Sequence, residues 1–400
     1  MSSAAVSGAD AVIIGGGVTG CGAAYHLALA GMSIVLLERG ALNRGASGRN
    51  AGSLHFQLQH QTASFDERKR RKLAATVPML KAAAGAWRRL SEAMDEDFEL
   101  VQRGGLMVAE TDAEVASLRA KHALEQAWQL NTELLDSRGA REAAPGISPR
   151  IQAATFCPYE GHANPRLVTL ALARAAQRHG ARLHTGSEVA SIQSEDACYQ
   201  VVTRNGLRFS TPRVVDAAGA WAGDVAALAG LPLPVQAVPL HMNVTERTGP
   251  LLALSLQHVG ERLSLKQLRD GNVLIGGGWP AHRRRMDGVV PKNGPVDVLY
   301  ESLARNVAVA VRVLPALSEV RLLRTWTGLA AWTPDGLPVL GEMRHRPDFY
   351  VACGGNGFTL GPLFAERLAE RILAGARSHE WAVLDPARFL GRAPIEAPPP

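Results

Sequence analysis

The chain has 400 residues, enough for two to three domains, and its 46% hydrophobic and 20% charged residues are ordinary proportions for a globular protein. The formal net charge of +6 is mild, and the basic runs 68–72 and 283–285 lack interleaved aromatic residues, so we interpret them as solvated surface, with a protein-partner surface as the alternative, and expect no nucleic-acid partner. No apolar run reaches membrane-spanning length and the N-terminus lacks a signal-peptide pattern, so we expect neither a membrane span nor export.

Residues 11–39 carry the most informative local motif. An apolar run over 11–14 enters a turn in which Gly15, Gly17 and Gly20 have the G-x-G-x-x-G spacing. The first glycine permits the tight turn, the second lets the backbone approach a pyrophosphate, and the third lets a helix pack closely on a strand. The spacing therefore predicts a dinucleotide-binding turn.

The residues that follow this turn strengthen the prediction. A helix is expected over 18–30, and its N-terminus presents free N–H groups and a positive dipole end to phosphates. A second apolar run over 34–37 ends at Glu38, where an acid accepts hydrogen bonds from the ribose hydroxyls. The acid favours an unphosphorylated ribose, and so FAD or NAD over NADP.

The rest of the chain alternates helical and strand patterns without an internal repeat. Helices are expected over 66–96, from Thr111 or Asp112 to about 130, and over 165–180, 297–314 and 361–374. Strands are expected over 106–108, 182–192, 199–209, 213–219, 235–245, 273–275 and 350–353. Gly-rich strand-to-helix junctions stand at both ends, so we expect the C-terminus to return to the nucleotide domain and the strand-rich middle to form an inserted second domain.

The four cysteines and the histidines show no metal-binding pattern. Cys21, Cys157, Cys198 and Cys353 are scattered and have no Cys-x-x-Cys spacing, so we expect no metal site and no iron–sulfur cluster in this chain. Such sparse cysteine usage suits a reducing compartment, and we expect a cytoplasmic protein.

Four motifs spread over nearly the whole length resemble one family. They are the opening Gly-rich unit, Gly45–Gly52 (GASGRNAG), Asp216–Trp221 (DAAGAW), and the pair Thr327–Gly336 (TGLAAWTPDG) with Gly354–Thr359 (GGNGFT). The chain resembles the FAD-dependent amine and amino-acid oxidoreductases that include D-amino-acid, glycine and sarcosine oxidases. This resemblance makes NAD an improbable main cofactor.

The resemblance implies an α/β (α+β) fold with a Rossmann-like FAD-binding domain of the glutathione-reductase type and an inserted mixed-sheet substrate domain. The expected ranges are 1–62, 150–230 and 320–392 for the FAD-binding domain, 63–149 and 231–319 for the substrate domain, and 393–400 for a flexible tail. Together the local motif and the resemblance predict non-covalent FAD contacts at Gly15, Gly17, Val18, Thr19, Gly20, Glu38, Arg39, Ser47, Arg49, Asn50, Ala51, Gly52, Val189, Ala218, Gly219, Trp221, Gly328, Gly355, Asn356, Gly357, Phe358 and Thr359.

The family's chemistry, as the resemblance implies it, is oxidation of an amine. The substrate amine is bound neutral, its α-hydrogen passes as hydride to flavin N5, and the imine product hydrolyses. The segments 50–57, 262–267 and 272–279 look most like the FAD-carrying β subunits of multi-subunit opine, D-hydroxyproline and L-proline dehydrogenases. That branch implies a hetero-oligomer whose electrons leave through partner subunits, including a ferredoxin-like protein, and it allows FMN at a subunit interface. The alternative is a stand-alone glycine, sarcosine or D-amino-acid oxidase that releases peroxide.

Departures from the family pattern concern the substrate. Gly328 stands where sarcosine oxidases attach FAD through a cysteine, which excludes that covalent link. Ala330 stands where glycine oxidases carry an arginine, and Thr359 where sarcosine oxidases carry a lysine. We also find no counterpart of their oxygen-activating lysine near 273–276. The usual carboxylate anchors therefore look absent.

Three residues remain as candidates for substrate contacts. His55 follows the flavin loop, with a capping or surface role as the alternative. Lys266 stands in a strand-like stretch and can pair with a carboxylate, with a solvated edge lysine as the alternative. His241 lies on an expected substrate-domain strand, where a packing role is the alternative. Hydride transfer to a flavin requires no catalytic triad or paired carboxylates.

Overall fold

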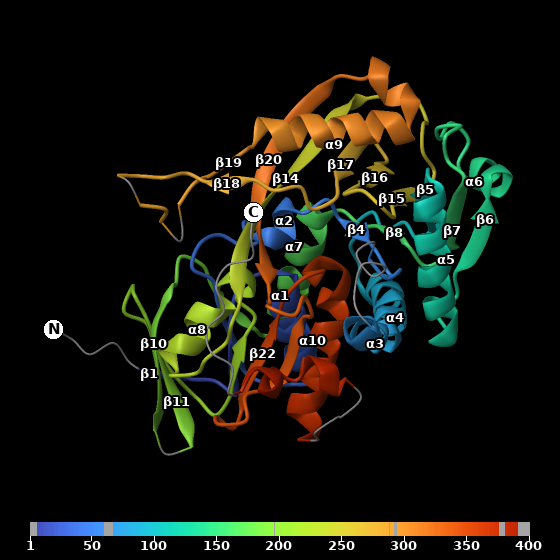
Figure 1. The fold of residues 1–400 in the computed structure, drawn as a ribbon. Coiled ribbons are helices and arrows are strands. Elements are labelled where there is room, and N and C mark those ends of the chain that lie inside the picture. Colours follow the sequence, from blue (N-terminus) through green and yellow to red (C-terminus); the bar gives the residue numbers. More distant parts are fainter. Residues whose placement is uncertain are drawn as a thin grey trace.

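The protein is described by a computed structural model that covers residues 6–59, 67–195, 197–287, 289–291, 294–375 and 381–390. Two large sheets dominate the molecule. A six-stranded sheet carries helices on one face in the lower part of Figure 1, and an eight-stranded sheet lies above it. Among the described helices, none is both long and apolar enough to cross a membrane.

The six-stranded sheet brings the two ends of the chain together. Its strands, in spatial order, are β21 (Val339–Glu342), β22 (Phe349–Cys353), β13 (Val214–Asp216), β2 (Ala11–Ile14), β3 (Ile34–Leu37) and β9 (Arg182–His184). All neighbours are parallel except β21 and β22. The runs in β2 and β3 are buried along their whole length, as expected where both faces of a parallel sheet are covered. The C-terminal strand thus returns to the sheet of the Gly-rich turn.

Helices cover one face of this sheet and a smaller sheet covers the other. The helices are α1 (Val18–Leu29), α7 (Pro165–Arg178) and α10 (Gly357–Ala374), which share one apolar core with the sheet (Figure 1). On the other face, a second core joins the sheet to α8 (Ala222–Leu228) and to a four-stranded sheet of β1 (Val6–Gly8), β12 (Arg208–Thr211), β11 (Cys198–Thr203) and β10 (Val189–Glu195).

The eight-stranded sheet forms the second layer. Its spatial order is β20 (Leu322–Trp332), β14 (Gln236–Arg247), β17 (Asn272–Gly276), β16 (Ser264–Gln267), β15 (Ser255–His258), β5 (Gly105–Ala109), β7 (Ala153–Cys157) and β6 (Glu133–Asp136). The β15–β5 pair is parallel and the other pairs are antiparallel, so the sheet is mixed. Helix α9 (Tyr300–Val313) covers one face over an apolar core, and the opposite face turns toward the nucleotide motifs.

Short elements connect these layers. They are α2 (Ala46–Arg49), β4 (Ser53–Leu54), α3 (Glu67–Ala74), α4 (Val77–Ala93), α5 (Asp112–Ala127), α6 (Ser137–Ala143), β8 (Gly161–His162), β18 (His282–Arg283), β19 (Val296–Asp297) and the 3₁₀ helices η2 (Gly219–Trp221), η3 (Pro315–Glu319), η4 (Ala382–Leu384) and η5 (Pro386–Phe389). The β4 strand pairs with β8, so the segment after α2 lies beside the start of α7.

The expected fold class is confirmed, whereas several element boundaries were wrong. The helix expected over 66–96 is two helices, because Pro78 in the first turn of α4 lacks the N–H that a continuous helix needs. The expected strands 182–192 and 199–209 are each divided, because Gly186 and Gly206 turn the chain at positive φ. The last helix begins at Gly357, four residues earlier than expected, since Asn356 in the left-handed region starts it.

The sheets bear on the expected domain ranges at two places. Strands β7 and β20, which those ranges assign to the FAD-binding domain, hydrogen-bond within the eight-stranded sheet. The division into domains otherwise stays a prediction. The expected flexible tail 393–400 and the side chains of 68–71 in the first basic run lie outside the described residues.

Candidate active site

The turn between β2 and α1 is built from close backbone contacts. Gly15 has φ +115°, and a Cβ on it would lie 2.5 Å from the carbonyl oxygen of Ala217 at the end of β13. A Cβ on Gly20 would lie 2.0 Å from the Gly15 oxygen. Both positions therefore require glycine. The N-cap residue of α1, Gly17, has no side chain, and Ser47 Oγ accepts the Val18 N–H at 3.0 Å. The other N–H groups of the first turn, which includes Thr19, remain as donors at a positive dipole end.

Glu38 and Trp221 lie beside this turn. The Glu38 carboxylate accepts hydrogen bonds from the N–H groups of Gly16 and Gly40, both at 2.8 Å, which holds it at the end of β3. The Arg39 guanidinium lies 3.7 Å from the ring centroid of Trp221, in the 3₁₀ turn that follows Ala218. Val189 begins β10 nearby, because the Ser187 N–H donates to the Glu38 carbonyl. These groups surround the place where a ribose and an adenine would bind.

The loop that follows α2 packs against the eight-stranded sheet on its way to β4. Trp326 Nε1–H donates to the Arg49 carbonyl at 2.8 Å, and a Cβ on Gly328 would lie 3.2 Å from Arg49 Cβ. Asn50 caps the following turn, since its Oδ1 accepts the Gly52 N–H at 2.6 Å. The loop that the sequence assigned to the flavin therefore lies against β20.

The C-terminal motif closes on the same loop from the other side. Asn356 Nδ2 donates to the His55 carbonyl and Thr359 Oγ1 to the Ser53 carbonyl, both at 3.3 Å. No described side chain caps α10, and a Cβ on Gly361 would lie 2.6 Å from Val18 Cγ1. The first turns of α10 and α1, which lie side by side in Figure 1, therefore point two positive dipole ends toward one region.

Strand registers decide which side chains of the eight-stranded sheet face this region. Lys266 of β16 pairs with Leu274, and Ser264 pairs with Gly276. A Cβ on Gly276 would lie 3.9 Å from Ala51 Cβ, and one on Gly52 would lie 3.0 Å from Lys266 Nζ. Since side chains two apart on a strand share a face, Ser264 and Lys266 both face the flavin loop.

His55, Lys266 and Ser264 form the polar centre of this face. His55 Nε2 is 2.9 Å from Ser264 Oγ, while His55 Nδ1 and Lys266 Nζ are buried and have no hydrogen-bond partner in the part of the chain that the structure describes. Burial lowers the pKa of Lys266 well below its usual value. Burial, together with the charge of Lys266, lowers the pKa of His55 to about 3. Burial, Lys266 and Arg103 together lower the pKa of His162 to about 3. Both imidazoles are therefore neutral at physiological pH.

His241 lies on the opposite face of the sheet. Its neighbour Asn243 donates to Asn306 of α9, and His241 N–H and Nδ1 contact the carbonyl oxygens of Trp279 and Pro280. Burial lowers the pKa of His241. Because alternate residues of β14 face opposite ways, the structure does not bring His241 together with His55 and Lys266.

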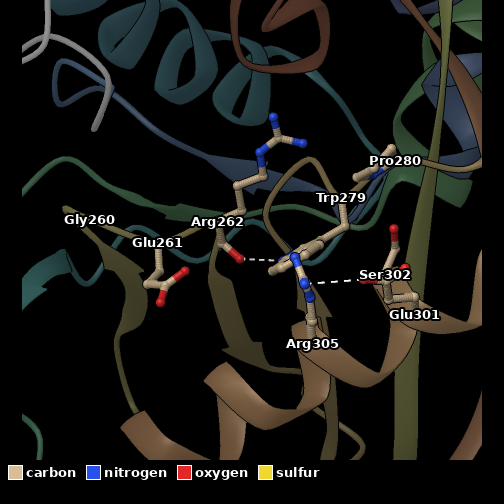
Figure 2. A pocket seen from close by; sticks show the side chains of 8 residues that line it. All are labelled: Gly260, Glu261, Arg262, Trp279, Pro280, Glu301, Ser302 and Arg305. Carbon is tan, nitrogen blue, oxygen red and sulfur yellow. Dashed lines mark hydrogen bonds and ion pairs between the residues drawn. The ribbon is translucent and has the colours of Figure 1, made fainter. Parts of the chain in front are cut away.

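A separate hollow of about 470 Å³ lies on this α9 side, as Figure 2 shows. Trp279 Nε1–H donates to the Arg262 carbonyl at 2.5 Å, and Arg305 is paired with Glu301 at 3.1 Å. None of the residues that the sequence analysis proposed for cofactor or substrate lines it. The hollow is thus distinct from the region where the nucleotide motifs converge.

Sequence reasoning missed Ser264, His162 and Trp326. The first could have been found from its position two residues before Lys266, on the same face of a strand. His162 and Trp326 gave no local signal, because only the pairing of β4 with β8 and of β14 with β20 brings them to the loop. The family's lysine was sought near 273–276, yet the buried lysine of this face lies directly opposite Leu274, on β16.

The residues present fit a dinucleotide and its flavin. The close contacts at Gly15 and Gly20 exclude side chains, and the N-terminal ends of two helices converge. Near Gly52, two buried polar atoms have no hydrogen-bond partner among the described residues. These features define a dinucleotide-binding protein of the Rossmann-like class. Within the described residues, no group of three or more His, Cys, Asp and Glu side chains could hold a metal ion.

Comparison with known proteins identifies the family. The family model for DAO, described as FAD dependent oxidoreductase, matches residues 10–371. The chain therefore belongs to the DAO family of FAD-dependent oxidoreductases, and FAD is its cofactor.

Relatives resemble the chain over almost its full length. Glycine oxidase of Geobacillus kaustophilus (strain HTA426) is 27% identical, with 97% of this chain and 99% of that protein covered. An opine oxidase subunit of Rhizobium meliloti is 26% identical, with 95% and 97% covered. Human mitochondrial sarcosine dehydrogenase is 29% identical over 96% of this chain, but the chain spans only 42% of that protein.

Solved structures agree with the fold. The crystal structure of L-proline dehydrogenase from P. horikoshii is 26% identical with a TM-score of 0.84, covering 96% of this chain and 98% of that one. The crystal structure of the Geobacillus kaustophilus glycine oxidase has a TM-score of 0.81 at 25% identity, covering 96% and 100%. The confirmed resemblance is thus to oxidoreductases that bind FAD, several of which are named for amino-acid substrates.

Proposed function

We propose that the chain oxidises the CH–NH bond of a secondary or cyclic amino acid, such as an opine or D-hydroxyproline, as the catalytic subunit of a hetero-oligomer. The observation that carries the proposal is the pair of buried, unpartnered atoms, Lys266 Nζ and His55 Nδ1, beside the flavin loop at Gly52. A buried polar atom without a partner is costly, which favours a ligand as its missing partner. When bound, FAD supplies the two-electron acceptor for a hydride from the substrate's α-carbon.

Lys266 and His55 suit the binding of an amino-acid carboxylate. Burial lowers the pKa of the Lys266 amine, and an approaching carboxylate would raise that pKa because it favours the charged form. Binding of an anionic substrate would therefore increase the proton affinity of the Lys266 amine. His55 is fixed through Nε2 by Ser264 and keeps Nδ1 for a second hydrogen bond.

Small residues line the strand beside the flavin loop. Gly328 and Ala330 stand two apart on β20, so they share a face, and they pair with Leu240 and Val238. An arginine at position 330, where glycine oxidases carry one, would fill this space. The small side chains support a substrate larger than glycine, such as an amino acid with a ring or an N-substituent.

The N-terminal dipole ends of α1 and α10 would stabilise negative charge that develops on the flavin during the reaction. Their first turns, which no N-cap side chain closes, point backbone N–H groups toward the region where we expect the pyrophosphate and the flavin. Fixed N–H donors stabilise negative charge without reorganisation. The protein's part in the reaction is therefore placement and stabilisation of charge.

The assembly and location are proposed on two further observations. One relative is named as a subunit of an opine oxidase, which supports an assembly of several subunits. We further propose, from the family resemblance alone, that electrons pass to partner subunits including a ferredoxin-like protein, with FMN at a subunit interface. All four cysteines are unpaired, which supports a reducing, cytoplasmic location.

The test is anaerobic bleaching of the flavin in the purified chain. We expect octopine, nopaline, hydroxyproline or proline to bleach the flavin faster than glycine, with a dye accepting the electrons and little peroxide formed on admission of air. Failure of every amine to bleach the flavin would contradict the oxidation of CH–NH bonds.

A stand-alone oxidase of glycine, sarcosine or a D-amino acid is the second candidate. Lys266 favours it, because it is a buried lysine on the flavin-facing side of the sheet, and sarcosine oxidases activate oxygen with a lysine expected near this strand. Rapid peroxide release by the isolated chain would support this candidate against the hetero-oligomer.

A further inference from the structure

Two fully buried carboxylates hold the main chain that follows His55. Glu160 and Glu125 are 0% exposed. Glu160 Oε1 accepts the N–H groups of Phe56 and Gln57, at 2.9 and 3.0 Å, and Glu125 Oε1 accepts that of Leu58 at 2.8 Å. Three consecutive backbone donors therefore end on two buried carboxylates.

Among the described residues, every recorded hydrogen-bond partner of the Glu160 carboxylate is a donor. Besides the two backbone groups, Gln57 Nε2 and Gln257 Nε2 each lie 3.2 Å from Oε2. Burial raises the pKa of Glu160, and the donors from Gln57 and Phe56 oppose that rise. A protonated carboxyl would turn a donor toward one of these groups, so the arrangement fits the ionised form.

The neighbouring side chains fix the orientation of Gln57. Gln57 Oε1 accepts from Lys121 Nζ at 3.0 Å and from Thr155 Oγ1 at 2.6 Å. Lys121 is also paired with Glu125 at 2.7 Å. Since the amide oxygen is bound on one side and the amide nitrogen on the other, the Gln57 amide cannot flip to meet a changed partner at residue 160.

The other end of the segment belongs to the flavin site. The Ser53 and His55 carbonyls accept from Thr359 and Asn356 of the C-terminal motif, and His55 Nε2 contacts Ser264. Glu160 is also followed directly by Gly161, which pairs with Leu54. Residues 53–58 are thus held at one end by the flavin site and at the other by the carboxylates.

We propose that Glu160 is a positioning residue of the flavin site, which as a carboxylate holds Phe56 and Gln57 so that His55 keeps its place beside Lys266 and the flavin. The expected effect on flavin reduction rests on the proposed function, whereas the expected position of His55 rests only on the contacts of Glu160. Burying a carboxylate is unfavourable compared with apolar packing. The four donors that converge on Glu160 are therefore better explained by a need to fix the position of residues 56–57 than by a need to stabilise the fold.

The test compares Glu160→Gln with Glu125→Gln. Both remove one fully buried carboxylate, but only E160Q places an amide nitrogen against Gln57 Nε2 and Gln257 Nε2. In the protein stripped of FAD, we expect E160Q to speed hydrogen exchange at the Phe56 and Gln57 amides at least tenfold, and E125Q to do so at Leu58. With FAD bound, we expect E160Q to shift the visible flavin spectrum and reduction potential, and to slow flavin reduction at saturating substrate at least tenfold, more than E125Q does.

A compensating variant separates positioning from general destabilisation. In E160Q/Q257E the carboxylate at 257 accepts from the new amide, so we expect recovery of at least half of the spectral shift and of the lost rate. If E160Q does not fold, Gln257→Met, which removes one donor, should give a smaller shift in the same direction. Equal effects of E160Q and E125Q on the flavin, or an unchanged flavin in E160Q and Q257M, would overturn the proposal. Amide hydrogen exchange, the flavin spectrum and the flavin reduction potential are all measured without substrate. Failure of the proposed function can therefore be distinguished from failure of the positioning role of Glu160.

Discussion

The two halves of the site differ in how far apart their residues stand in the sequence. In the nucleotide half, Gly15, Gly20 and Glu38 fall within one strand–helix–strand unit, where Gly20 packs on the Gly15 carbonyl and Glu38 accepts the Gly16 N–H, and one distant contact is added by Ala217 after β13. In the substrate half, His55 meets Ser264 across 209 positions of sequence. The first half is assembled by local geometry, whereas the second exists only once the eight-stranded sheet has formed over the flavin loop.

The largest expected effect comes from breaking the local half. In Gly20→Ala, the added Cβ would lie 2.0 Å from the Gly15 oxygen and 3.3 Å from Ala217 Cβ, and a backbone oxygen cannot move aside as a flexible side chain can. We expect FAD affinity to fall at least about a hundredfold, roughly 2.7 kcal/mol, as measured by fluorescence titration. Gly8→Ala is the matched control, because nothing lies within 4 Å of a Cβ there. Binding by G20A within threefold of the unmodified protein would contradict the close-packed turn.

The next largest effect concerns the loop that connects the eight-stranded sheet to the six-stranded sheet. Asp335, in the loop between β20 and β21, is paired with Lys72 and Arg388. Burial alone would raise the pKa of Asp335, but the hydrogen bonds from Arg388 and Lys72 outweigh it and lower the pKa to about 2. The carboxylate therefore stabilises the fold above a pH of about 4, and this contribution is lost as pH falls toward 2.

Asp335→Asn tests that loop. We expect a loss of about 2–3 kcal/mol in the free energy of unfolding at pH 7, with the difference from the unmodified protein shrinking below about pH 4. Urea unfolding at several pH values measures it. Asp95→Asn serves as the control, since the Asp95 side chain is 92% exposed. A pH-independent difference would contradict the ion-pair explanation.

A third prediction breaks the substrate half alone. In Lys266→Met we expect FAD to bind normally and flavin reduction by substrate to slow at least tenfold, about 1.4 kcal/mol in the barrier. The folded chain holds the lysine less protonated than the unfolded chain does, because burial lowers the pKa of Lys266. Stability of the unmodified protein should therefore rise with pH toward about 10.4, the unfolded value.

The melting temperature provides the second readout for Lys266. We expect K266M to melt higher than the unmodified protein at pH 7, with the gap closing as pH approaches 10. Lys81→Met, at an exposed position of α4, is the control. A melting temperature of K266M that stays below that of the unmodified protein at every pH would show that the buried amine is satisfied in the fold.

The smallest expected effect concerns the contact of Trp221 with Arg39 in the nucleotide half. Trp221→Ala removes the ring under the Arg39 guanidinium. A cation–π contact of this kind is worth about 1 kcal/mol, so we expect FAD to bind about fivefold more weakly, with the rate of flavin reduction at saturating FAD unchanged. Competitive displacement by ADP measures the adenine side directly. A change in rate larger than the change in affinity would place Trp221 nearer the flavin than we infer.

The sequence predicted the parts of the fold that depend on neighbouring residues. The turn at Gly15, the end of β3 at Glu38 and the start of α5, which Thr111 caps as one of the two residues expected there, depend on local backbone geometry. It failed where a turn or a proline interrupts a pattern, as at Gly186 and Pro78. It also left open which face of β14 bears His241, because alternation fixes relative orientation and not which side meets the flavin loop.

By itself, the sequence determined the dinucleotide turn and the acid beside it, because glycine spacing and a strand-ending carboxylate act over a few residues. It also marked His55 and Lys266 as candidates, since a charged or imidazole side chain near a flavin motif is chemically informative. Only the tertiary structure decided that these two residues lie on one buried face with Ser264 and that His241 faces away. It also decided that Glu160 holds the main chain directly after His55. Those relations depend on strand register and on contacts across one hundred to two hundred positions, which no local pattern encodes.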